Sequence, residues 1–190
     1  MARALVVLLL CLISFPANAE LSGQGSLHWS ERVYVWRYNP ADEPAWLNEG
    51  EALAMIRDAA TKWEACGVVL PYAGLSDKPP GEMDGENVIG WKGGGRDYSA
   101  WTNWQTRRSG QAIEADVTLY ANIFTTYREK GIDARLELRK SIVHELGHVL
   151  GLTHSDHPGD AMIVKIRTRP EWRLPSDNDI SRCRALYSGQ

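Results

Sequence analysis

Residues 144–154 limit what this chain can fold into more than any other feature, because they read HELGHVLGLTH and so have the form HExxHxxGxxH. Residues i and i+4 lie on one face of a helix, so His144 and His148 can direct their imidazoles at one ion. Glu145 lies about 100° around the helix from His144, which places its carboxylate beside the ion instead of among its ligands. Gly151 lets the chain leave the helix with a positive φ, and the turn returns His154 as a third ligand.

Three protein ligands leave the fourth position of a tetrahedral zinc ion open for water, which is typical of catalytic zinc sites. A single histidine on an amphipathic helix is usually an ordinary core or surface residue, but three of the five histidines of this chain stand in this one register. We therefore predict one catalytic Zn²⁺ held by His144, His148 and His154, with Glu145 as the general base for hydrolysis.

At these residues the sequence resembles the metzincin superfamily of zinc endopeptidases, and Ser155 directly after the third histidine resembles its matrixin branch. The resemblance implies that Met162, eight residues after His154, forms the methionine turn beneath the zinc ion. Ordinary core packing is the alternative for Met162, and the two interpretations overlap because such a methionine packs under the site without ligating it. The similarity extends to a helix ending in Lys62–Trp63, a strand at residues 114–117 and a closing helix at residues 179–187.

The resemblance also implies a protein or peptide substrate that lies extended along an edge strand near residues 99–106. Trp101 and Trp104 are candidates to line that cleft, and burial in the core is the alternative for both. The chain departs from the family in its histidines, since only His28 and His157 lie outside the motif, so the second, structural zinc of animal matrixins is not expected. No cysteine-switch prodomain is expected between the signal and the first strand.

Two further readings of the site stay open. The chain could be a secreted zinc-binding interaction module without significant hydrolysis, although such a module has no need of Glu145 beside an open zinc position. It could also hydrolyse cell-wall peptides or small peptides instead of proteins. Calcium is possible at acidic residues such as Asp77, Asp84 and Asp97, but no EF-hand spacing supports it, and a solvated loop is favoured.

Hydrophobic periodicity predicts an α+β domain with a mostly continuous sheet. The resemblance makes it a metzincin-like zincin domain with a twisted, mostly parallel sheet of about five strands and three helices. The expected strands are residues 32–38, 68–72, 88–91, 100–105 and 112–120. One helix is expected over residues 50–65, and a second from an Asp133 N-cap to Gly151. The last helix is expected after Ser176, which forms a capping box with Asp179.

The first 19 residues predict a secretory signal peptide, with Arg3, an apolar run over residues 4–15 and the sequence Ala-Asn-Ala before cleavage after Ala19. We therefore expect residues 20–190 to form one catalytic domain that is secreted or periplasmic, has no membrane anchor and is a monomer. Removing the signal takes away only Arg3 among the charged residues, so the formal net charge goes from −3 to −4. Without a long basic run, nucleic-acid binding is not expected.

Cys66 and Cys183 are the two cysteines that remain after the signal is removed. An exported chain is in a compartment where disulfides persist, so we predict that these two residues are bridged. Two buried free thiols are the alternative.

Overall fold

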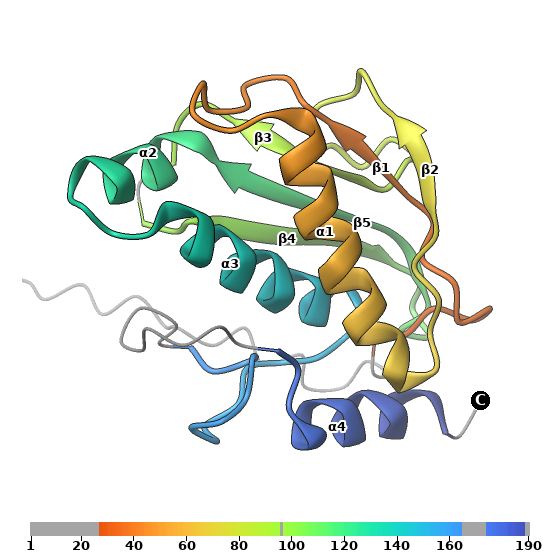
Figure 1. The fold of residues 1–190 in the computed structure, drawn as a ribbon. Helices are drawn as coiled ribbons and strands as arrows, with labels where there is room; N and C mark the ends of the chain where they lie inside the picture. The colour runs from red at the N-terminus through yellow and green to blue at the C-terminus, as the bar shows by residue number, and fades with distance from the viewer. Residues whose placement is uncertain (1–26, 96, 165–173, 189–190) are drawn as a thin grey trace, which may run out of the picture.

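The structure, a computed structural model, describes residues 27–95, 97–164 and 174–188 (Figure 1). The predicted signal peptide lies outside the described residues. The described part of the chain contains five strands, four α-helices and one 3₁₀ turn. In chain order these are β1 (Trp36–Asn39), α1 (Glu49–Trp63), η1 (Glu64–Cys66), β2 (Tyr72–Leu75), β3 (Val88–Lys92), β4 (Ala100–Thr106), β5 (Ala112–Tyr120), α2 (Ala121–Glu129), α3 (Ala134–Val149) and α4 (Asp177–Tyr187).

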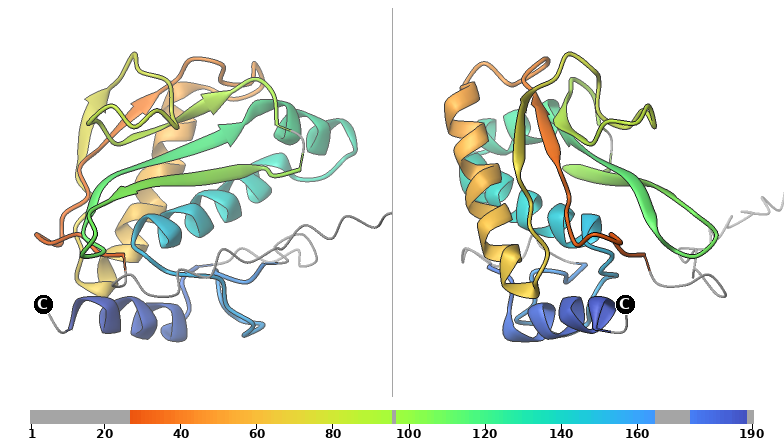
Figure 2. Two further views of the ribbon diagram at one scale, coloured as in Figure 1. Left: turned by 180° about the vertical axis from the view of Figure 1, so that it is seen from behind. Right: turned by 90° about the vertical axis from the view of Figure 1, so that its right-hand side faces the viewer.

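The five strands form one mixed sheet in the order β2-β1-β3-β5-β4. Neighbouring strands are parallel from β2 to β5, and β4 runs antiparallel to β5 at the edge of the sheet. The predicted α+β class with a mostly parallel sheet is therefore confirmed, and β4 lies at an edge as the resemblance implied. β4 is also the strand nearest to α3 (Figure 2).

Helices α1 and α3 pack together against one face of the sheet, and α4 lies across the end of α1 (Figures 1 and 2). The core between these layers is rich in aromatic side chains that are almost completely buried: Tyr34, Trp36, Tyr38, Trp63, Trp91, Phe124 and Tyr187. Among the described residues, no helix is both long enough and apolar enough to cross a membrane.

The helix starts predicted from capping residues are found in the structure. The Asp133 side chain accepts hydrogen bonds from the backbone N–H groups of Arg135 and Leu136 at the start of α3. Ser176 and Asp179 form the reciprocal capping box at the start of α4. Both caps satisfy N–H groups that have no partner within their own helix.

Three expectations about the elements need correction. The strand predicted over residues 32–38 begins only at Trp36, and the strand predicted over residues 68–72 is displaced to Tyr72–Leu75. Before those points the two segments pair through one isolated β-bridge, between Val33 and Val69, and a register irregularity follows.

Helix α2 was not predicted, and it raises the number of α-helices from three to four. Its N-cap, Tyr120, makes no side-chain capping bond and only Ala121 and Phe124 are buried, so the usual sequence signals are missing.

Two buried carboxylates on β5 hold the long loop between β2 and β3. Glu114 accepts hydrogen bonds from the N–H groups of Asp84 and Gly85 at 2.8 and 2.7 Å. Asp116 accepts from Gly81 and Val88 at 2.6 and 2.7 Å. Because burying an unpaired carboxylate is costly, these four bonds fix the loop to the sheet.

The disulfide joins Cys66, at the end of η1, to Cys183 on α4, with a Cα–Cα distance of 5.6 Å. Both residues are buried. The bond closes a loop with a sequence separation of 117 residues, and in the chain-entropy model such a loop stabilises the fold by roughly 4–5 kcal/mol. It ties α4 to the end of the α1 segment.

Gly147 lies where α3 packs on α1. A Cβ at this position would stand 2.2 Å from Met162 Sδ and 2.8 Å from the Trp63 ring. Trp63 cannot easily move away, since its indole N–H donates to the Val143 carbonyl oxygen at 2.8 Å. Only glycine fits here.

We predict that Gly147→Ala lowers the free energy of unfolding by roughly 1–3 kcal/mol, because the added methyl group overpacks the core. Urea denaturation measures this change. Gly50→Ala is the matched control, since its nearest contact would be an ordinary 3.5 Å from Asn48 Oδ1. The control should be neutral or slightly stabilising. Equal stability of Gly147→Ala and the parent would contradict the packing shown by the structure.

A second prediction concerns pH. Burial raises the pKa of Asp116 from its ordinary value of 3.8 to about 6, against the opposing effect of its two backbone hydrogen bonds. Between these values the folded protein holds a proton that the unfolded chain has released, so the stability contributed by Asp116 falls as the pH rises.

The Asp116→Asn variant should lack this dependence. The parent should therefore lose roughly 1–3 kcal/mol of unfolding free energy relative to the variant between about pH 4 and pH 6. Urea unfolding across this range measures the difference, with Asp58→Asn on the surface of α1 as the control. Parallel pH profiles for parent and Asp116→Asn would show the account of this carboxylate to be wrong.

Candidate metal centre and active site

The three histidines of the motif converge at the C-terminal end of α3. The Nε2 atoms of His148 and His144 are 3.1 Å apart, and those of His148 and His154 are 3.3 Å apart. Ligands about 2.0–2.1 Å from a tetrahedral zinc ion are separated by about 3.3–3.4 Å, so these two separations are close to those of a tetrahedral zinc site. His144 is buried, His148 is half-buried and His154 is exposed, which leaves one side of the group open to solvent.

Backbone carbonyl groups orient two of the imidazoles. His144 Nδ1 is 2.8 Å from the Ala161 carbonyl oxygen, and His148 Nδ1 is 2.7 Å from that of Leu152. A carbonyl oxygen can only accept, so each Nδ1 carries the hydrogen and each Nε2 keeps the lone pair that a metal needs.

Burial also keeps these histidines neutral. It lowers the pKa of His144 to about 4 and that of His148 to about 3, and it lowers the pKa of His154. For His148 the neighbouring His144 lowers the pKa further. At neutral pH the three rings are therefore unprotonated, as metal ligands must be.

The turn after α3 has the backbone geometry that the motif predicted. Gly151 adopts a φ of 96°, and a Cβ there would lie 2.2 Å from the Leu27 carbonyl oxygen. Leu152 then directs its carbonyl group back to His148, and two residues later the chain presents His154.

The segment after His154 closes into a loop that is fixed to α4. Ser155 N–H donates to the Met162 carbonyl oxygen at 2.9 Å, and Ser155 also bridges Ile163. The buried Asp160 accepts hydrogen bonds from Ser155, Ser176 and Asn178. Met162 is fully buried beside Gly147, so its side chain packs against α3.

Asp179 links this loop to a histidine of the motif. Its Oδ2 accepts a hydrogen bond from the Ala161 N–H at 2.7 Å, and the carbonyl oxygen of Ala161 accepts one from His144. Sequence reasoning identified Asp179 only as a helix cap and did not identify Asp160 at all. Nothing in the local sequence shows that Asp160 accepts from Ser176 and Asn178, or that Asp179 accepts from Ala161, because these partners are 16 to 18 residues apart.

Glu145 lies next to His144 and is 7% exposed. Burial raises the pKa of its carboxyl group to about 7, although a hydrogen bond from Thr102 opposes this rise. A general base works best when its pKa is near the working pH. A dication at the histidines would lower the pKa of this neighbouring carboxyl group and favour its charged form.

Thr102 was not identified from the sequence. Its hydroxyl group donates to Glu145 Oε2 at 2.5 Å from the edge strand β4, and the residue is only 3% exposed. The contact joins residues 43 positions apart, and a threonine in a strand gives no signal for it.

The two candidate cleft tryptophans are not core residues, since Trp101 is 48% exposed and Trp104 is 38% exposed. The Trp104 indole N–H donates to the His148 carbonyl oxygen at 3.0 Å, and its ring meets the His148 ring edge-on with 6.0 Å between centroids. Trp101 instead packs against Tyr98. Trp104 therefore borders the histidine cluster, and Trp101 stands farther along the exposed strand.

The other candidate ligands do not join the cluster. His28 bridges Gln111, and His157 lies 3.2 Å from Asp160. Asp84 forms an ion pair with Lys78 at 3.2 Å. Within the described residues, the three motif histidines are the one group of three or more such side chains whose ligand atoms lie within 4.8 Å of one another.

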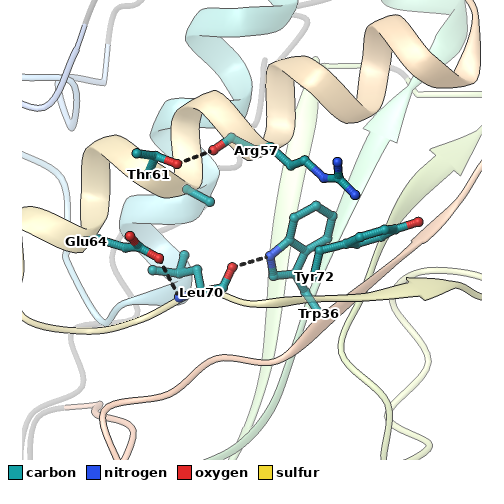
Figure 3. A pocket seen from close by; sticks show the side chains of 7 residues that line it. Trp36, Arg57, Thr61, Glu64, Leu70 and Tyr72 are labelled. Atoms are coloured by element: carbon teal, nitrogen blue, oxygen red, sulfur yellow. Dashed lines mark hydrogen bonds between the residues drawn. The ribbon is translucent and has the colours of Figure 1, made fainter.

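A separate hollow of about 280 Å³ opens between α1 and the strands β1 and β2 (Figure 3). There the Arg57 guanidinium stacks over the Tyr72 ring at 4.6 Å, and the Trp36 indole donates to the Leu70 carbonyl oxygen. None of the motif residues lines this hollow.

Comparison with known proteins agrees with the fold and identifies a family. Among solved structures, the GM1-bound form of the ECX AB5 holotoxin contains a similar chain, with 17% sequence identity and a TM-score of 0.56. The match covers 85% of this chain and 84% of that one, and at this identity it shows a shared fold alone. No curated protein sequence matches the chain significantly.

The model of the matrixin family matches residues 28–188. That range includes the sheet, all four α-helices of the described structure and the three clustered histidines. The chain therefore belongs to the matrixin family of zinc metallopeptidases.

Proposed function

We propose that this protein is an exported zinc-dependent endopeptidase in which His144, His148 and His154 hold the zinc ion and Glu145 is the general base. The observation that carries the proposal is that Glu145, directly after His144 on α3, is buried and held by Thr102, while the rings of the three motif histidines converge. An interaction module would need the histidines but not this carboxylate. Met162 would form the methionine turn that supports the site from below.

The histidine set suits zinc, because its three neutral nitrogen donors converge within 4.8 Å, two of their separations are close to tetrahedral values, and one side is open. When bound, zinc supplies a Lewis acid for the substrate carbonyl group and lowers the pKa of water. Residues of the chain orient the ligands, bind the substrate and transfer the protons. His144 and His148 keep their orientation through the Ala161 and Leu152 carbonyl groups, so the donors are aligned before substrate arrives.

Substrate binding is assigned to the exposed edge of β4. Among the described residues the strand pairs with β5 alone, and we assign the N–H and C=O groups of its other side to an extended peptide. Main-chain pairing of this type is nearly independent of sequence, so side-chain pockets would set the selectivity. Trp104, half exposed beside His148, would border the reacting peptide bond.

In the hydrolysis itself, Glu145 takes a proton from the attacking water as the new carbon–oxygen bond forms. The same carboxyl group then gives this proton to the amine nitrogen as the carbon–nitrogen bond breaks. Two proton transfers thus depend on one side chain.

Export is proposed from residues 1–19, whose basic start, apolar run and Ala-Asn-Ala end are typical of a cleaved signal. The disulfide between Cys66 and Cys183 supports an oxidising location. The catalytic domain would then consist of residues 20–190.

The Glu145→Gln variant tests the proposed function. The amide keeps the shape of the side chain but cannot accept the proton, so zinc content and thermal stability should match those of the parent. Peptidase activity should fall by at least ~10²- to 10⁴-fold. Activity on a mixed peptide library and zinc per chain are measured on the same samples.

His154→Ala is the matched control for metal loss and should reduce zinc content and activity together. If Glu145→Gln retained full activity per zinc, the proposed mechanism would be wrong. A parent that binds zinc but cleaves no peptide in the library would favour the interaction module.

A further inference from the structure

We propose that Thr102 is a positioning residue for Glu145, which holds the carboxylate in one orientation and directs its proton transfers to one oxygen atom. The proposal rests on the proposed function of Glu145 and adds to it a residue on another element. Its starting point is the 2.5 Å hydrogen bond from Thr102 Oγ1 to Glu145 Oε2, between two side chains that are both buried.

The backbone of Thr102 is itself well fixed. It pairs in register with Val117 in the middle of the β4–β5 ladder. A β-branched side chain in a strand has few χ1 choices, so the hydroxyl group stands at a defined point above α3. A glutamate carboxylate, in contrast, has three side-chain torsions to restrict. Because Thr102 is fixed in the sheet, its hydrogen bond restricts the orientation of the otherwise flexible Glu145 carboxylate.

The single hydroxyl proton also distinguishes the two carboxylate oxygens. It is directed at Oε2, with a longer contact of 3.2 Å to the Glu145 backbone carbonyl oxygen. An oxygen that already accepts a short hydrogen bond is the weaker base of the pair. We assign the proton taken from water to Oε1, from which it passes to the amine nitrogen while Thr102 keeps its own proton.

Within the described chain, Thr102 is one of three residues on β4, or directly before it, whose side chains hydrogen-bond to α3. The other two hydrogen bonds join the Ser99 and Ser141 hydroxyl groups at 3.0 Å and the Trp104 indole to the His148 carbonyl oxygen at 3.0 Å. These two contacts already dock the strand on the helix. Loss of the Thr102 hydroxyl should therefore disturb the carboxylate of Glu145 more than the position of the strand along which substrate would lie.

Four variants test this role: Thr102→Val, Thr102→Ala, Thr102→Ser and the control Thr118→Val. Thr118 is a buried threonine on the neighbouring strand, whose hydroxyl lies under the Gly81 loop and away from Glu145. Zinc content, thermal stability, kcat and KM are measured for each. The loss of a hydrogen bond to a charged group should reduce kcat by about 10- to 100-fold in Thr102→Val and Thr102→Ala, with KM within about 2-fold of the parent.

Thr102→Ser keeps the hydroxyl group and should restore kcat to within about 3-fold of the parent, whereas Thr118→Val should leave kcat unchanged. The comparison of Thr102→Ser with Thr102→Ala remains informative if the valine variant does not fold. Equal loss in the serine and alanine variants would overturn the proposal, because shape and not the hydroxyl group would then matter. A change in KM alone would also overturn it, since it would place Thr102 in substrate docking.

A second readout does not depend on activity. In crystals of parent and Thr102→Val at the same pH, the Glu145 carboxylate should occupy one orientation in the parent and a different one, or several, in the variant. An unmoved carboxylate in the variant would overturn the positioning role. If the parent cleaves no peptide, the proposed function fails, and this structural comparison still decides whether Thr102 positions Glu145.

Discussion

The hydrogen bonds from His144 and His148 to two backbone carbonyl groups are the interactions on which the rest of the site depends. They fix the tautomer and direction of both rings, so the alignment of the Nε2 atoms is a property of the backbone. The Leu152 carbonyl is placed by the positive φ of Gly151, and the Ala161 carbonyl by the bond from its own N–H to Asp179. Asp179 belongs to α4, which the disulfide holds against the end of α1.

Buried carboxylates organise three different parts of this small domain. Glu114 and Asp116 hold the loop between β2 and β3 through four backbone N–H groups. Asp160 and Asp179 hold the loop after His154 against α4. Within the part of the chain that the structure describes, Glu145 differs from these four in that its carboxylate accepts from one hydroxyl group, that of Thr102. Burial raises the pKa of both Glu145 and Asp116, but of these five carboxylates Glu145 is the one directly beside a motif histidine along the chain, where it can serve in proton transfer.

The features predicted from the sequence were those decided by neighbours along the chain. The spacing of His144 and His148, the glycine turn at Gly151 and the caps at Asp133 and Ser176 are all local. Helix α2 was missed because it lacks a cap and follows β5 without a break. Thr102, Asp160 and Asp179 were missed as site residues for another reason, namely that their partners come from other elements. Tertiary packing brings them to the site, and the hydrophobic periodicity of the sequence does not reveal such contacts between elements.

Anomalous diffraction at the zinc edge, from crystals of the protein loaded with zinc, determines directly which side chains hold the ion. We expect one peak per chain, about 2.0–2.1 Å from the Nε2 atoms of His144, His148 and His154. A single oxygen from solvent should complete the coordination, with Glu145 near that oxygen but outside the ligand set. Zinc bound through the Glu145 carboxylate, or with a fourth protein ligand that closes the open position, would contradict the assignment of this centre to hydrolysis.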